Sequence, residues 1–277
     1  MTSERTSEAP GEATAEATPH AGSRWALRLH DVHKRYGQRD VLSGVSFELA
    51  PGARLGVIGP AASGKTVIAK LVAGLEVPDR GVIEVLGHDL AGKRESELGA
   101  LRQRIGMLFQ NHALFDFLSV EQNVAFPLEQ RGRMAAPEIA TRVAERLRAV
   151  GLAGSEHKVI EELSGGMKKR VGIARATVAD AELVIYDEPT AGLDPVTTQK
   201  IYDLLAADQA RTGATVLAIS SDVTALASFV DEIAFLYHGQ IFYRGPARTI
   251  ADAPEPVVRQ FVRGELEGPL DEGTRRR

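Results

Sequence analysis

The chain has 277 residues, of which 44% are hydrophobic and 25% charged, with a net charge of −4 and no cysteine. This size and composition are typical of a globular protein with a sizeable core, arranged as one large domain or two small ones. The charge gives no electrostatic case for direct binding to nucleic acid or anionic lipid, and the lack of cysteine excludes disulfides.

The sequence also lacks the usual signals for membrane insertion or export. No apolar run approaches the ~20 residues that cross a bilayer, and the N-terminus lacks the apolar segment of a signal peptide. We therefore expect a chain that stays in the cytoplasm. Residues 1–24 are rich in Ser, Thr, Glu, Ala, Gly and Pro and predict a disordered tail.

Strand patterns begin at Trp25. Residues 25–29 and 45–49 alternate apolar and polar side chains, which predicts half-buried strands. The apolar run over residues 55–58 predicts a buried strand, and a helix is expected to begin at Thr66.

Between that strand and that helix, the sequence fits the P-loop pattern Gly-x-x-x-x-Gly-Lys-Thr. Glycines let backbone N–H groups surround phosphate oxygens, and the helix N-terminus adds positive charge. Lys65 is expected to reach the β- and γ-phosphates, and the Thr66 hydroxyl to bind Mg²⁺. An ordinary glycine-rich turn is the alternative, which the Lys-Thr ending disfavours. The predicted nucleotide-binding residues are Gly59, Pro60, Ala61, Ala62, Ser63, Gly64, Lys65 and Thr66, with no role assigned to residue 67.

The middle of the chain reads as helical. Apolar residues recur at helical spacing from Pro137 to Gly151, and a second helix is expected over residues 167–178. Within it, Lys168, Lys169 and Arg170 are expected to form a solvated face. Further strands are predicted over residues 182–188 and 214–219, with a helix over residues 195–210 between them. This alternation indicates an α/β fold with a mostly parallel core sheet.

Two carboxylates end the strand over residues 182–188. Asp187 is expected at the carboxyl edge of the sheet, where it could hold Mg²⁺, and Glu188 could polarise a water for attack on the γ-phosphate. An acidic cap on the following helix is the alternative. Beside a P-loop, the pair favours hydrolysis of ATP or GTP over nucleotide binding alone.

At this point the sequence resembles the ATP-binding subunits of ABC transporters, from about Trp25 to Ala247. The resemblance rests on an ordered set of motifs: Lys34-Arg-Tyr-Gly37, the P-loop, Leu108-Phe-Gln110, Leu163-Ser-Gly-Gly-Met167, Leu183 to Glu188, and Ala191-Gly-Leu-Asp194. It implies an ABC-type P-loop ATPase fold with an antiparallel β subdomain and a helical subdomain at about residues 111–178, within a domain over residues 25–248.

The resemblance also implies roles for individual residues. Tyr36 would stack on adenine, although an ordinary strand-end aromatic is the alternative, and Gln110 would contact Mg²⁺ and the attacking water. Two chains would form a head-to-tail homodimer with two ATP molecules at its interface. The signature residues Ser164, Gly165 and Gly166, together with Asp194, would contribute to that shared site.

A narrower resemblance points to the ATPases of Mla and Mce lipid transport systems. It rests on residues 107–115 and 123–128, on Leu163 to Arg170, and on the segment Val257 to Gly264. It implies transport of phospholipid or other lipid across the bacterial envelope, with this chain peripheral on the cytoplasmic face of the inner membrane. The implied partners are integral-membrane permease subunits and a lipid-binding Mce- or Mla-type protein, with no nucleic acid.

Two surfaces would serve these contacts. A coupling helix of the permease would dock near Leu114, Phe115 and Phe117, although plain core is the alternative for that apolar set. The C-terminal extension over residues 249–277 would contact the partner ATPase subunit.

Two positions depart from the family pattern. Ala62 stands where a glycine is common, and its methyl group is unfavourable if the residue needs a positive φ. Ser221 stands where the family has a histidine that contacts the γ-phosphate. We take Glu188, Gln110 and Ser221 as the catalytic residues. Because serine is shorter than histidine and uncharged, we predict slow hydrolysis. The alternatives are a nucleotide-dependent switch or scaffold with little turnover and the ATPase of a different ABC importer; a role on ribosomes or DNA is disfavoured.

Overall fold

A computed structural model describes residues 24–110 and 113–270. The predicted disordered tail therefore lies outside the described residues, apart from Arg24. The strands are β1 (Leu27–Tyr36), β2 (Arg39–Leu49), β3 (Arg54–Ile58), β4 (Arg80–Val85), β5 (His88–Asp89), β6 (Ile105–Leu108), β7 (Leu183–Asp187), β8 (Thr215–Ile219), β9 (Glu232–Tyr237) and β10 (Gln240–Pro246). The helices are α1 (Lys65–Val72), α2 (Glu95–Arg102), α3 (Val120–Arg131), α4 (Ala136–Ala149), α5 (Gly165–Thr177), α6 (Pro195–Thr212), α7 (Val223–Phe229) and α8 (Pro256–Arg263).

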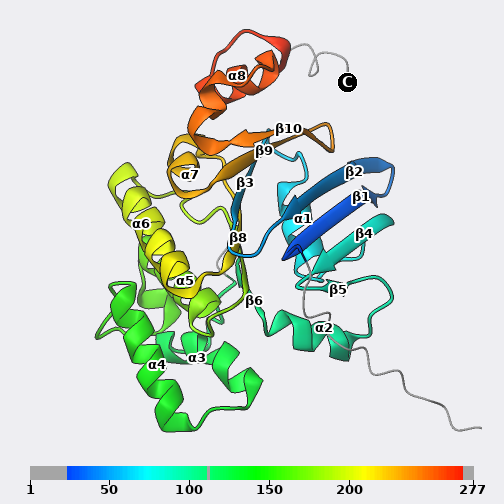
Figure 1. Cartoon of the computed structure of the whole chain (residues 1–277). Coiled ribbons are helices and arrows are strands. Elements are labelled where there is room, and N and C mark those ends of the chain that lie inside the picture. Colours follow the sequence, from blue (N-terminus) through cyan, green and yellow to red (C-terminus); the bar gives the residue numbers. More distant parts are fainter. Residues whose placement is uncertain (1–23, 111–112, 271–277) are drawn as a thin grey trace, which may run out of the picture.

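The strands form two sheets (Figure 1). The smaller is antiparallel with the order β2-β1-β4-β5, and the larger has the order β10-β9-β3-β8-β7-β6. In the larger sheet every neighbouring pair is parallel except β9 with β10. The expected α/β fold, with its mostly parallel core sheet and antiparallel β subdomain, is confirmed.

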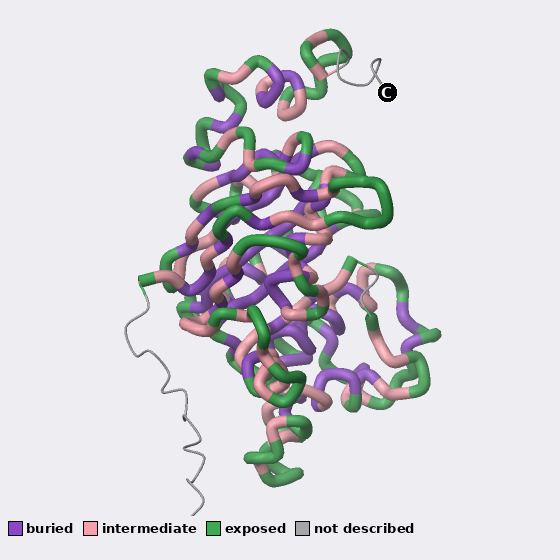
Figure 2. The backbone as a smooth tube through the Cα atoms, turned by 90° about the vertical axis from the view of Figure 1, so that its right-hand side faces the viewer, coloured by how far each residue is buried: buried purple, intermediate pink, exposed green. Residues whose placement is uncertain are grey.

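Alternating side chains of the larger sheet build two cores. On β7, Leu183 and Ile185 join the cluster that contains α1 and the antiparallel sheet, while Val184 and Tyr186 face the cluster that contains α5, α6 and α7. Strand β8 divides its side chains in the same way. A strand buried on both faces has a nearly continuous apolar sequence, and the buried stretch at the centre of Figure 2 follows from this pattern.

The helices α3 and α4 lie together at one end of the molecule, where a helical subdomain was expected (Figure 1). Each has a local reason to begin where it does. Ser119 caps α3 by accepting a hydrogen bond from the Gln122 N–H at 3.2 Å, and Pro137 stands in the first turn of α4. Helix α5 packs against both α3 and strand β6, so it connects this region to the core.

The C-terminal helix α8 lies beyond β10 (Figure 1) and follows a short 3-10 helix, η2 (Ala247–Asp252). Val257 and Val258 are buried against their own chain, and the Phe261 ring lies 5.2 Å from that of Phe235. The apolar face assigned from the sequence to the partner subunit is thus used largely within the chain. Among the described residues, no helix is both long and apolar enough to span a membrane.

Candidate nucleotide site

Three neighbouring parallel strands place the site at one edge of the larger sheet. Strand β3 leads into the Gly59 loop, β7 ends at Asp187, and β8 leads to Ser221. Because β3 and β7 both pair in parallel with β8, their carboxyl ends meet at that edge. Ligands bind at this edge in open α/β sheets.

The Gly59–Thr66 loop has a backbone that suits glycine. Gly59 and Gly64 have φ values of 151° and 106°, and a Cβ at Gly59 would lie 2.2 Å from the Leu236 carbonyl oxygen. Ala62 also has a positive φ, 57°, so the question raised by the sequence is answered: its methyl group occupies a left-handed conformation. That conformation costs about 1–2 kcal/mol for a residue with a Cβ.

Lys65 opens helix α1 directly after this loop. Its Nζ donates hydrogen bonds to the carbonyl oxygens of Gly59 and Pro60, at 2.8 and 2.9 Å. Burial lowers the pKa of Lys65, and the nearby Glu188 and Asp187 oppose that shift. The N-cap residue Gly64 offers no side chain, so the first N–H groups of α1 remain for an anion.

Asp187 is 1% exposed, and burial raises its pKa. The Thr66 hydroxyl hydrogen-bonds to it, whereas its Oδ1 atom finds no partner among the described residues. A buried carboxylate oxygen without a partner, next to a hydroxyl and the amide of Gln110, matches the oxygen ligands that Mg²⁺ prefers. The residues present therefore fit the ion expected from the sequence.

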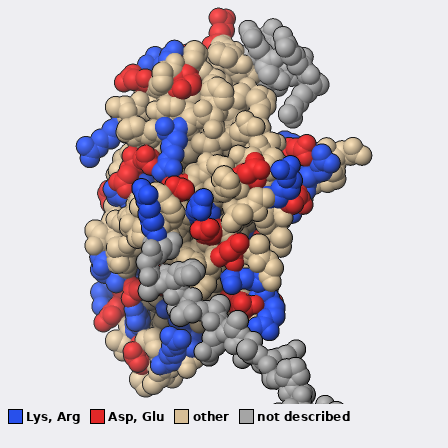
Figure 3. Space-filling view, turned by 45° about the vertical axis from the view of Figure 1, so that its right-hand side comes forward, with Lys and Arg blue, Asp and Glu red and all other residues tan. Residues whose placement is uncertain are grey.

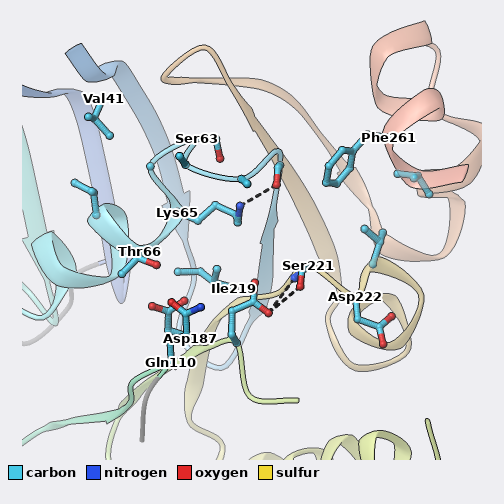
Figure 4. A pocket seen from close by; sticks show the side chains of 18 of the residues that line it. Val41, Ser63, Lys65, Thr66, Gln110, Asp187, Ile219, Ser221, Asp222 and Phe261 are labelled. Atoms are coloured by element: carbon cyan, nitrogen blue, oxygen red, sulfur yellow. Dashed lines mark hydrogen bonds between the residues drawn. The ribbon is translucent and has the colours of Figure 1, made fainter. Parts of the chain in front are cut away.

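Glu188 has a left-handed backbone with φ of 52°. Such strain costs on the order of 1–3 kcal/mol and persists where the surroundings hold it. Its N–H donates to the Ile219 carbonyl at 2.9 Å, and its Oε2 accepts from the Ser221 backbone N–H and hydroxyl at 3.2 and 3.1 Å (Figure 4). The resemblance puts Ser221 where the family has a histidine that contacts the γ-phosphate; in the structure the Ser221 hydroxyl donates a hydrogen bond to Glu188.

These groups line one cavity of about 910 Å³ (Figure 4). The predicted site residues that it brings together are Tyr36, Gly59, Ala61, Ala62, Ser63, Gly64, Lys65, Thr66, Gln110, Asp187, Glu188 and Ser221. Pro60 instead lines a neighbouring hollow on the α8 side of the loop.

Tyr36 stands at the end of β1 with 44% of its surface exposed. Its hydroxyl hydrogen-bonds to Glu76, and burial together with this carboxylate raises the pKa of Tyr36 to about 12. The phenol therefore stays neutral and anchored at neutral pH, with its ring at the cavity. This position is compatible with stacking on adenine and with an ordinary aromatic residue at a strand end.

The remaining predicted residues lie outside this cavity. Ser164 caps α5 by accepting a hydrogen bond from the Met167 N–H at 3.3 Å, and Gly165 and Gly166 form the first turn of that helix. Asp194 caps α6 by accepting from the Thr197 N–H at 2.9 Å, and its bonds to Thr197 lower its pKa. All four belong to helix starts that do not line the nucleotide cavity of their own chain.

One expectation for α5 is wrong. Lys169 was assigned to a solvated face, but it is 4% exposed, and its Nζ donates to the Glu188 carbonyl oxygen at 2.7 Å. Helical spacing puts Lys169 on one face with Gly172, Ile173 and Ala176. A lysine on such an apolar face indicates burial, and the expectation of a solvated face missed this signal. Other lining residues include Arg39 and Asp222, which carried no sequence signal, and Phe261, Val262, Arg263 and Gly264, whose segment the sequence assigned to the partner subunit.

The apolar set after Gln110 is not plain core. Phe117 is 84% exposed, while Leu114 is partly buried against the core. Phe115 lies between them, with its ring 4.9 Å from Phe126 and the Arg175 guanidinium 5.6 Å from its centre.

Comparisons with known proteins agree with this geometry. A family model described as "ABC transporter" matches residues 42–191. The chloroplastic protein TRIGALACTOSYLDIACYLGLYCEROL 3 of Arabidopsis thaliana is 40% identical, over 88% of this chain and 75% of that protein. The methionine import ATP-binding protein MetN of Caulobacter vibrioides is also 40% identical, over 88% of this chain and 74% of that protein. A dimeric ATP-binding cassette solved in a post-hydrolysis state with ADP and phosphate matches with a TM-score of 0.75 and 28% identity, over 80% of this chain and 99% of that one.

Proposed function

This chain belongs to the ATP-binding subunits of ABC transporters, and from that premise we propose that it hydrolyses ATP to drive lipid transport across a bacterial envelope. The observation that carries the hydrolytic part is the cavity in which Lys65, Asp187 and Glu188 converge. Its walls supply cationic donors for phosphate, oxygen ligands for a metal ion and a carboxylate for a water.

Each residue has a separate task in this proposal. Lys65 and the first N–H groups of α1 bind phosphate oxygens, and Thr66, Asp187 and Gln110 hold Mg²⁺. The bound ion neutralises charge on the phosphate oxygens. Glu188 orients a water and accepts its proton, while its contacts with Ser221 fix the direction of the carboxylate. We propose slow turnover, because serine replaces the longer histidine expected at this position.

A second chain completes the site in our proposal. Ser164, Gly165 and Gly166 lie outside their own cavity and open helix α5, whose first N–H groups form another anion site. In a head-to-tail homodimer, this turn and Asp194 would face the nucleotide of the partner. A similar solved cassette is dimeric, which supports the pairing of two chains.

Membrane partners would dock next to the Gln110 segment, at a second cavity. A cavity of about 700 Å³ there is lined by Phe109, Phe115 and Phe126, and the exposed Phe117 stands close to Phe115. This surface suits an amphipathic coupling helix. We propose permease subunits as its occupants, with the chain on the cytoplasmic face of the inner membrane and a Mce- or Mla-type protein in the same complex. On the face that Figure 3 shows, Lys and Arg are interspersed with Asp and Glu, and we propose no nucleic-acid partner.

The substrate is the finer part of the proposal. Lipid is supported by the similarity to a protein named after a galactolipid and by the Mla- and Mce-like motifs of the sequence. Import of a small molecule is the second candidate, because the methionine import protein matches with equal identity.

A complex purified through a tag on this chain would distinguish the two. We expect permease subunits and bound lipid, identified by mass spectrometry, and ATP-dependent phosphate release that lipid-loaded vesicles stimulate. Stimulation by methionine with a soluble amino-acid receptor, and no bound lipid, would favour the importer. Phosphate release at the buffer rate would support a switch or scaffold and contradict the hydrolytic role.

A further inference from the structure

Lys169 is a buried cation at the back of the nucleotide cavity. It is 4% exposed on α5, and its Nζ donates to the main-chain oxygen of Glu188 at 2.7 Å. Lysine is almost never buried without a partner. Burial lowers its pKa, while the charges of Glu188 and Asp187 oppose that shift.

The residue that Lys169 holds has a backbone conformation that needs support. Glu188 is a non-glycine residue with φ of 52°, and a strained backbone persists only where its surroundings fix it. Three elements fix it: β8 accepts from its N–H, the segment at Ser221 donates to its carboxylate, and α5 donates to its carbonyl through Lys169. Of these contacts, the one from Lys169 is the shortest.

We propose that Lys169 is a positioning residue for ATP hydrolysis, which holds the Glu188 carbonyl and thereby aims the carboxylate at the water. This inference rests on the proposed role of Glu188 as the base. Because Ser164 caps the same helix and Gly166 lies in its first turn, Lys169 also joins the signature turn to the base of its own chain. Movement of α5 when that turn meets the partner's phosphate would therefore reach Glu188 directly.

A positioning role for Lys169 and a role in nucleotide binding predict different kinetic effects. Lys169 contacts the main-chain carbonyl of Glu188 and does not line the cavity, so its loss should change the chemical step and leave ATP binding intact. Removing a residue that orients a metal ligand typically changes affinity or activity by about 10–100-fold, and we expect the same range for a residue that orients Glu188. A purely structural lysine would instead lower thermal stability, or change KM and kcat together.

The test compares Lys169→Met, which removes both donor and charge, with Lys169→Gln, whose amide can still donate to a carbonyl. Steady-state phosphate release with ATP and Mg²⁺ is measured on the full-length chain, with thermal unfolding as the check of folding. We expect Lys169→Met to lower kcat by about 10–100-fold with KM for ATP within about twofold of wild type. Lys169→Gln should recover kcat to within about threefold. Lys168→Met, in the neighbouring half-buried lysine, is the matched control and should keep the wild-type rate.

Wild-type turnover in Lys169→Met would overturn the proposal. So would a Lys169→Gln variant that folds normally but loses as much kcat as Lys169→Met, and this comparison holds even if the methionine variant does not fold. The variant Glu188→Gln separates the role of Glu188 as the base from the role of Lys169 in positioning it. Full activity in that variant would remove the proposed base itself, whereas an inactive Glu188→Gln beside an active Lys169→Met would remove only the role of Lys169.

Discussion

At the scale of single residues, the Ser221 hydroxyl is a donor to the proposed base, with its oxygen 3.1 Å from Glu188 Oε2. We expect Ser221→Ala to lower kcat about 10-fold without a change in ATP affinity. The loss stays moderate because the backbone N–H of the same residue still donates to this oxygen at 3.2 Å. Phosphate release and equilibrium binding of a fluorescent ATP analogue measure the two effects. An unchanged kcat would show that this hydroxyl does not help to orient Glu188.

Replacing Ser221 by histidine tests whether the serine is the cause of slow ATP turnover. A histidine would add a donor at the γ-phosphate, and one such donor is worth about 10²–10³ in rate. We predict that Ser221→His raises turnover of the assembled complex. Unchanged or lower turnover would instead mean that the serine, with its bond to Glu188, is the adapted residue of this site.

Asp187 gives a prediction on pH. Burial raises its pKa above the ordinary value of 3.8, so between 3.8 and the raised pKa the folded chain binds more protons than the unfolded chain. The free energy of unfolding therefore falls as the pH rises through this window, and the ionised carboxylate destabilises the folded chain above it. Without Mg²⁺ or nucleotide, Asp187→Asn should unfold at a higher temperature than wild type at pH 7.

That stability difference should shrink as the pH falls through the raised pKa and be smallest below 3.8. The same variant should lose the thermal stabilisation that ATP with Mg²⁺ gives to the wild type, since a metal ligand is gone. Thermal unfolding at several pH values measures both effects. Lower stability of Asp187→Asn at pH 7 would show that the native carboxylate is already well satisfied by Thr66 and its neighbours.

At the scale of the elements, helix α8 belongs to the core of its own chain. Val258 is fully buried there, so an aspartate at this position would place a charge in an apolar contact. We expect Val258→Asp to lower the free energy of unfolding by about 3 kcal/mol. Leu266→Asp, at a residue that is 92% exposed, is the control and should change stability by less than about 0.5 kcal/mol.

These unfolding measurements belong at protein concentrations where the chain is monomeric. If Val258→Asp leaves the monomer stable and only weakens a dimer in sedimentation, α8 would belong to the partner, as the C-terminal sequence alone led us to expect.

Several helix starts and one buried strand could be predicted from the sequence. Turns with special backbones are encoded locally: the P-loop glycines, the glycine-rich turn at Ser164 and Pro137 predict helix starts that lie within two residues of those of α1, α5 and α4. The strand over β7 was recognised because burial on both faces leaves an unbroken apolar run.

Contacts between segments that are distant in the sequence could not be predicted from local sequence patterns. The bond from Lys169 to Glu188 and the bond from Ser221 to the same residue join parts of the chain that only the folded sheet brings together. The positive φ of Glu188 likewise follows from those contacts, because glutamate has no preference for this conformation. The strain is therefore a property of the assembled site.

At the scale of the whole molecule, our proposal assigns phosphate binding to two helix starts that do not line the same cavity. The start of α1 lines the nucleotide cavity, and the start of α5 does not. A closed site would therefore need a second chain, whose α5 faces the first chain's α1. In our proposal ATP closes this dimer, hydrolysis at Glu188 reopens it, and the surface at Phe115 transmits the movement to the membrane subunits.

Sedimentation of the Glu188→Gln chain with ATP and Mg²⁺ tests this account most directly. Removal of the base should stop phosphate release and trap a dimer that holds two ATP molecules, and ADP should return it to monomers. Adding Ser164→Arg should leave ATP binding to each chain intact but prevent the dimer, because the arginine blocks the signature turn. A monomer in the presence of ATP, or phosphate release at the wild-type rate by Glu188→Gln, would contradict the account.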